Sequence, residues 1–153
     1  MATAVRPITD RAKIDAILRD PWIAAKIAVD GQNAGYIDHP NLSYFGAYVD
    51  GDLVGVFMRV RFTATETEVH AALLKRALPH SRELGRLFID EIFNDPRILR
   101  ITAHIIGSLG SAINYCRKLG FSIEGERRSA CVKNGEVLSV VTLGLLRSES
   151  RTA

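Results

Sequence analysis

The hydrophobic pattern of the first forty residues predicts two short helices followed by a loop. Apolar residues at positions 14, 17 and 18 recur at helical spacing, and Thr9 and Asp10 are suited to capping that helix. Pro21 fits the first turn of a second helix, which carries apolar residues at positions 22, 23, 27 and 29. Residues 31–40 are rich in Gly, Asn, Asp and Pro, so we expect a loop there.

Strands dominate the next stretch of the chain. Residues 44–49 and 53–61 are largely apolar and flank Asp50-Gly51, a dipeptide that adopts the positive φ angles of a tight hairpin turn. Residues 67–74 follow as a third predicted strand. The sequence therefore predicts a three-stranded meander.

In the second half, the pattern predicts helices alternating with strands. Apolar positions 84, 87, 88 and 92 give one face of a helix over residues 82–93, which Asn94-Asp95-Pro96 ends. The later predicted elements are a strand over 99–106, a helix over 111–119 ending at Gly120, a strand over 121–133, a turn at Asn134-Gly135 and a strand over 137–146. This order predicts an α/β fold, an α+β mixed sheet with helices on both faces. We expect one domain over residues 1–147 and a loose polar tail over 148–153.

Composition narrows the classes of function. The 153 residues fit one domain, and 20 Lys and Arg against 17 Asp and Glu give a formal charge of +3, too small to indicate nucleic acid binding. No apolar run is long enough to span a membrane, and the first residues lack a signal-peptide pattern, so we expect a cytoplasmic protein without a membrane partner. Cys116 and Cys131 have no metal-ligand spacing and are expected to be free thiols.

The segment 112–125 (AINYCRKLGFSIEG) carries the strongest motif. Gly120 is expected to end a helix in the left-handed region, and Phe121 to enter the core where the next strand starts. A helix cap with a core aromatic explains these two residues, but not the order of the elements around them. The segment resembles the A-x-x-x-Y-x-K-x-G-F-x-x-x-G region of the GNAT acyltransferases, and the likeness extends over nearly the whole chain. It implies an acyl-CoA N-acyltransferase fold, a mostly antiparallel sheet and acetyl-CoA as cosubstrate.

A second segment, Arg82-Glu83-Leu84-Gly85-Arg86-Leu87, is similar to the family's Arg/Gln-x-x-Gly-x-Gly/Ala turn. In the family, N–H groups of that turn bind the cofactor pyrophosphate with help from the helix dipole. Leu87 departs from the motif, and charged residues here are equally typical of a solvated first helical turn. The pantetheine arm would lie along strand-four backbone at about 72–78. The resemblance thus implies these cofactor-binding residues: Leu73, Leu74, Arg82, Glu83, Leu84, Gly85, Arg86, Leu87 and Tyr115.

Glu66, Glu68 and His70 alternate along the predicted fourth strand and so share one of its faces. Three ionisable groups there cost free energy unless they are solvated or functional, so an exposed polar face is the alternative interpretation. The Glu-Val-His triplet resembles small bacterial and phage-encoded family members. The resemblance implies that Glu68, poised near neutrality in a partly apolar cleft, takes a proton from the substrate amine, with His70 as the alternative base.

The family's usual Tyr, which protonates the departing thiolate, falls at Cys116. A thiol with an ordinary pKa near 8.5 matches the leaving thiol in acidity, although Cys is also commonly a small buried hydrophobe. The candidate catalytic residues are therefore Glu68, His70 and Cys116, with no metal.

Two functions stay open. One is N-acetyltransfer from acetyl-CoA to a primary amine, by direct attack, on a protein N-terminus or a small molecule. The other is a degenerate GNAT domain that serves as a CoA-binding or virion-associated interaction module. The charged face of the fourth strand favours the first. Three departures from the family's pattern favour the second: Leu87, Cys116, and Leu109, which stands where the family often has an Asn before this helix. The sequence leaves a homodimer open.

Overall fold

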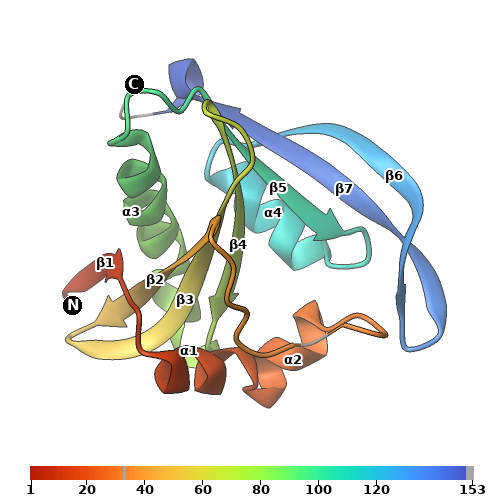
Figure 1. Ribbon diagram of the computed structural model, residues 1–153, viewed down its shortest axis with the longest axis horizontal. Helices are drawn as coiled ribbons and strands as arrows, with labels where there is room; N and C mark the ends of the chain where they lie inside the picture. Colours follow the sequence, from red (N-terminus) through yellow and green to blue (C-terminus); the bar gives the residue numbers. More distant parts are fainter. Residues whose placement is uncertain (33, 151–153) are drawn as a thin grey trace.

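Seven strands form one mixed sheet in the order β1-β2-β3-β4-β5-β7-β6 (Figure 1). The computed structural model describes residues 1–32 and 34–150. Neighbouring strands are antiparallel except β4 and β5, which run parallel. The strands are β1 Thr3–Pro7, β2 Leu42–Val49, β3 Asp52–Arg61, β4 Glu66–Leu73, β5 Arg100–Ile106, β6 Ser122–Lys133 and β7 Glu136–Leu146.

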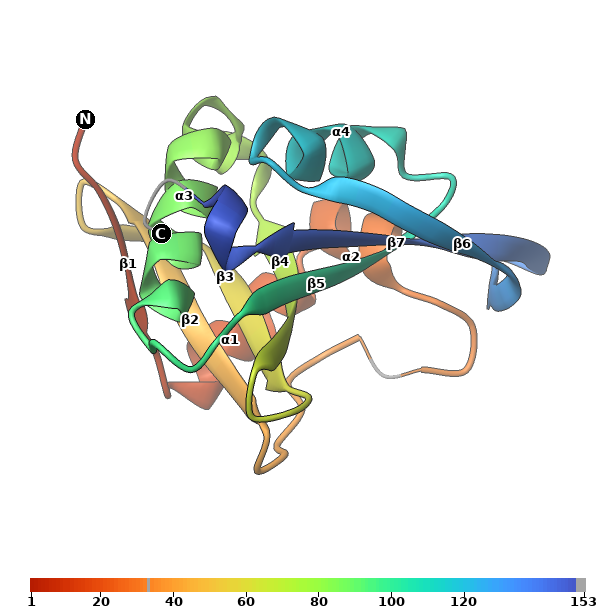
Figure 2. The ribbon, with the colours of Figure 1, turned by 90° about the horizontal axis from the view of Figure 1, so that it is seen from above.

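Helices cover both faces of this sheet, as the sequence predicted (Figures 1 and 2). The helices α1 Arg11–Leu18 and α2 Pro21–Ile27 supply apolar residues to a cluster on one face, and α3 Ser81–Phe93 supplies a larger cluster on the other. Helix α4 Gly110–Lys118 packs against that larger cluster. The fold class is confirmed, and no described helix has the length and apolar character that crossing a membrane requires.

Local signals placed most elements correctly. Asp50 and Gly51 have φ angles of 50° and 85°, and Asn134 and Gly135 have 51° and 78°, so both dipeptides form the predicted hairpin turns. Asp10 caps α1 by accepting a hydrogen bond from the Lys13 N–H.

Two features differ from the expectation. The short edge strand β1 was not predicted and pairs with β2. Strand β4 ends at Leu73 and is followed by a 3₁₀ helix, Lys75–His80, so the supposed strand-four backbone does not reach residue 78. After β7 the chain forms a 3₁₀ turn, Arg147–Glu149, in which Arg147 donates to three backbone carbonyls. Residues 151–153 of the predicted loose tail lie outside the described residues.

Candidate functional site

Strands β4 and β5 separate halfway along their length. They pair from Glu66 and Arg100 to Val69 and Ala103, yet β4 continues to Leu73 and β5 to Ile106. Figure 1 shows the two strands diverging beyond the paired part. The separated ends line a cavity of about 610 Å³. Residues from α3 and α4 line it on one side of the sheet, and residues from α2 and the segment after it on the other.

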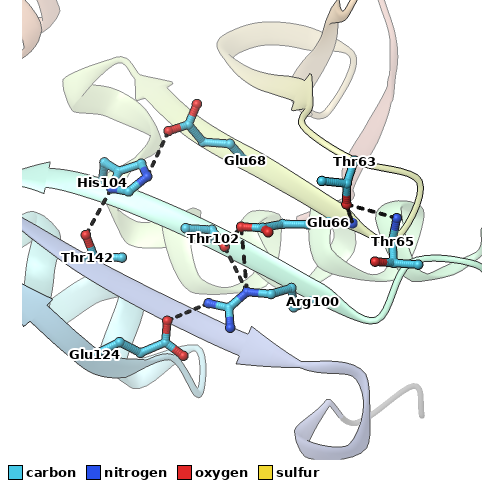
Figure 3. A network of polar contacts seen from close by, with 9 residues as sticks. All are labelled: Thr63, Thr65, Glu66, Glu68, Arg100, Thr102, His104, Glu124 and Thr142. Carbon is cyan, nitrogen blue, oxygen red and sulfur yellow. Dashed lines mark hydrogen bonds and ion pairs between the residues drawn. The ribbon is translucent and has the colours of Figure 1, made fainter.

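A carboxylate between two imidazoles lies at the edge of this opening. Glu68 on β4 faces His104 on β5, with 3.2 Å from Oε1 to the His104 Nε2, and its Oε2 lies 3.6 Å from the His70 Nε2. The other ring nitrogen of His104 is 3.1 Å from the Thr142 hydroxyl on β7 (Figure 3). The predicted pair Glu68 and His70 is therefore brought together at the cavity, and His104 joins it.

The electrostatics of Glu68 differ from the expectation. The His70 ring beside the carboxylate lowers the pKa of Glu68 most, the charge of His104 lowers it further, and partial burial opposes the shift only in part. A carboxylate poised near neutrality was therefore the wrong expectation. Glu68 is held in its ionised form and is suited to stabilising positive charge on an imidazole.

Glu66 shares the strand face with Glu68 but has a different environment. It accepts a hydrogen bond from the Thr102 hydroxyl at 2.8 Å and lies 3.8 Å from the Arg100 Nε (Figure 3). Arg100 also pairs with Glu124 on β6 at 2.5 Å. This network ties β4, β5 and β6 together and occupies Glu66, which is a structural group here.

Cys116 and Tyr115 lie on α4 at the other side of the cavity. Burial raises the pKa of the Cys116 thiol to about 11, well above the ordinary value on which its proposed acid role depended. Burial also raises the pKa of Tyr115, whose hydroxyl donates to the Ser81 carbonyl at 2.7 Å. Tyr115 thus packs against α3, and Cys116 packs against the larger core cluster.

The predicted phosphate segment begins inside a helix. Because α3 starts at Ser81, Arg82 to Leu87 form its first turns rather than a turn preceding it. Leu84 is fully buried, and a Cβ on Gly85 would collide with the Tyr115 ring, so close packing of α4 explains that glycine. Glu83 accepts a hydrogen bond from Thr3 on β1.

Other predicted cofactor residues divide between core and surface. The N–H of Leu74 donates to the Val54 carbonyl, and its side chain packs on the α1 side of the sheet, while Leu73 packs against the opposite core. Arg86 and Leu87 line a second hollow beside Gly120 and Leu145, away from the opening between β4 and β5. Arg82 is exposed near the start of α3, where its charge adds to that helix end.

His104 is the functional candidate that sequence reasoning missed. Its signal was the alternation of Arg100, Thr102 and His104 along the predicted strand 99–106. That pattern becomes informative only once β5 is known to lie parallel to β4. No group of His, Cys, Asp and Glu side chains within residues 1–32 and 34–150 is arranged to hold a metal ion.

Comparisons with known proteins agree on the fold. No protein-family model and no curated protein sequence matches the chain. Among solved structures, spermidine N-acetyltransferase from Vibrio cholerae in complex with CoA and spermine matches with a TM-score of 0.81 and 16% identity over 96% of each chain. The aminoglycoside acetyltransferase AAC(6')-Ib in complex with coenzyme A matches with a TM-score of 0.75 and 18% identity, over 97% of this chain and 96% of that one. A crystal structure of a putative acetyltransferase gives 0.78 and 17%, over 96% and 84%. The chain therefore has the GNAT fold, and the resemblance is confirmed at that level.

Proposed function

We propose that this protein is an N-acetyltransferase that moves an acetyl group from acetyl-CoA to a primary amine by direct attack. The observation that carries the proposal is the pair Glu68 and His70 at the point where β4 and β5 separate, beside a cavity reached from both faces of the sheet. CoA-bound acetyltransferases of spermidine and of aminoglycosides share the fold, which supports the reaction class.

The separated strands fit an extended cofactor arm. Beyond Val69, the edge of β4 that faces β5 has no strand partner among the described residues, so its backbone groups suit an extended chain that carries amides. The first N–H groups of α3 receive no side-chain cap, and Arg82 adds positive charge there, which suits an anionic pyrophosphate. Bound acetyl-CoA would supply the activated acetyl thioester.

His70 is the best placed group to take the proton of the attacking amine. Both ring nitrogens of His104 face protein groups, Glu68 and Thr142, so His104 is a positioning residue for the carboxylate. His70 directs Nε2 toward Glu68, while its Nδ1 has no hydrogen-bond partner within the described chain, and 40% of its side chain is exposed. Glu68 would stabilise the imidazolium that forms, in the way the carboxylate of a catalytic triad does.

The bond changes balance without a further protein acid. The amine nitrogen bonds to the acetyl carbon, the carbon–sulfur bond breaks, CoA leaves as its thiolate and the amine proton passes to His70. With a pKa of about 11, Cys116 is a weaker acid than an ordinary thiol and would not protonate that thiolate efficiently. We therefore assign Cys116 no chemical step.

Two measurements test the proposal. Calorimetric titration with CoA should give one site per chain, and acetyl-CoA with a panel of primary amines should give acetylated product detected by mass spectrometry. Arg82→Gln should weaken CoA binding and leave the unfolding transition unchanged, because Arg82 is exposed. Absence of CoA binding would refute the proposal, and binding without transfer to any amine would favour the interaction module.

A further inference from the structure

The cavity on the amine side of the opening has mostly apolar walls. On the face that carries Glu68 and His70, half-buried or exposed apolar side chains from four parts of the chain line it: Ile27, Val29, Ile37, Met58, Cys131 and Val140. They come from α2, the segment after it, β3, and the hairpin of β6 and β7. An acceptor that reaches His70 therefore places its body against hydrocarbon.

Negative charge in this cavity is limited to the reacting centre. Among the described residues that line it, Glu68 is the one carboxylate and Arg127 the one permanent cation. The Glu68 carboxylate already lies between His70 and His104. A second ammonium group on the acceptor would find no further carboxylate within the described walls, and burying an unpaired charge is costly.

Nearby acidic residues are engaged elsewhere. Asp15 pairs with Arg19 and accepts from the Tyr36 N–H, and Asp38 pairs with Arg11 at 2.7 Å. Both carboxylates therefore already have a cationic partner on the surface of the protein.

Asp30 joins two walls of the cavity, the segment after α2 and the hairpin of β6 and β7, through hydrogen bonds. Its carboxylate accepts from the N–H groups of Asn134 and Gly135 at 3.0 and 2.9 Å, and its own N–H donates to the Val132 carbonyl at 2.8 Å. Lys133 also donates to the Ala28 carbonyl at 2.5 Å. Figure 1 shows the segment after α2 reaching the tip of the hairpin of β6 and β7. These hydrogen bonds hold the segment after α2 against the hairpin, so two of the apolar walls keep a fixed position relative to each other.

We propose that the acceptor is a small monoamine with an apolar body, such as an alkyl or arylalkyl amine, and not a polyamine. The proposal rests on the acetyltransferase function proposed above and adds the class of its substrate. It separates this protein from the matched acetyltransferases of spermidine and aminoglycosides, which the shared fold alone would not do.

A matched pair of amines tests the proposal directly. Hexylamine and 1,6-diaminohexane have the same carbon chain and differ by one ammonium group. We expect kcat/KM for hexylamine to exceed that for the diamine by about tenfold or more, and to exceed that for propylamine by about tenfold, since apolar walls reward added methylenes. Spermidine and a short peptide with a free N-terminus should be acetylated more slowly than hexylamine. Equal or faster transfer to the diamine, to spermidine or to the peptide would overturn the proposal.

A charge placed in the wall should reverse the preference. Ile37 lines the cavity with 50% of its surface exposed, so Ile37→Glu is expected to fold normally and to raise kcat/KM for the diamine relative to hexylamine. Ile37→Gln is the matched control, with nearly the same shape and no charge, and should leave the ratio near that of the wild type. An unchanged ratio in Ile37→Glu would count against these walls as the acceptor site.

The same experiments distinguish failure of the acetyltransferase function from failure of the proposed substrate class. If CoA does not bind, the acetyltransferase function fails, and the substrate class fails with it. If CoA binds and the diamine or spermidine is preferred, the substrate class alone is wrong. If CoA binds and no monoamine of the panel is acetylated, the monoamine class is also refuted.

Discussion

Replacing Glu68 by Gln removes one negative charge from the site while keeping the size of the side chain. The carboxylate lies 3.6 Å from the His70 ring nitrogen, so a full charge pair would contribute between about 1 and 5 kcal/mol for effective dielectric constants of about 80 and 20. Because 40% of the His70 side chain and 26% of the Glu68 side chain are exposed, solvent screening places the value toward the lower part of that range. We take about 2 kcal/mol, which corresponds to a loss of about 30-fold in kcat/KM.

Cofactor affinity distinguishes this role from a structural one. Glu68→Gln should lower kcat/KM and leave the affinity for CoA unchanged in calorimetry, because Glu68 acts on the His70 imidazole and not on the cofactor. His70→Gln removes the proposed base itself and should lower kcat/KM more, by about 10²-fold or more. Initial rates with acetyl-CoA and a saturable amine between pH 5 and 9 measure both effects.

Glu66→Gln is the matched control for Glu68→Gln. Glu66 lies on the same strand face with the same 26% exposure, but it is bound to Thr102 and Arg100. Glu66→Gln should therefore leave kcat/KM and the affinity for CoA near those of the wild type. Wild-type kinetics in Glu68→Gln, a large loss of its CoA affinity, or equal losses of kcat/KM in the two variants would refute the reasoning.

Three further predictions concern packing and reactivity. Gly85→Ala should destabilise the fold by about 1–3 kcal/mol in urea unfolding, because the new methyl group meets the Tyr115 ring; a more stable variant would contradict this packing role. Cys116 should react with iodoacetamide at pH 8 more slowly than Cys131, because a pKa of about 11 leaves about one part in a thousand as thiolate; equal labelling in a peptide map would contradict it. Arg147→Met should lose about 1–3 kcal/mol of stability because three backbone carbonyls lose their donor, and an unchanged melting curve would argue against that anchoring.

The sequence by itself determined the local parts of this protein. Positive φ angles at Asp50-Gly51 and Asn134-Gly135 follow from which residues tolerate them, and the Asp10 cap follows from a short acceptor side chain before an apolar helical pattern. These signals need only neighbours in the chain. They also placed Glu68 and His70 on one strand face, because alternation in a strand is a local property.

Only the tertiary structure decided what surrounds those two residues. His104 reaches Glu68 because β5 lies parallel to β4, and Gly85 is required where α4 approaches α3. Contacts of this kind join residues about 30 or more positions apart, and their energy depends on burial and on partners that no local pattern encodes. The same reason explains why the pKa of Glu68 falls while that of Cys116 rises. A carboxylate beside two imidazoles gains charge partners, whereas a thiol packed against the core loses water.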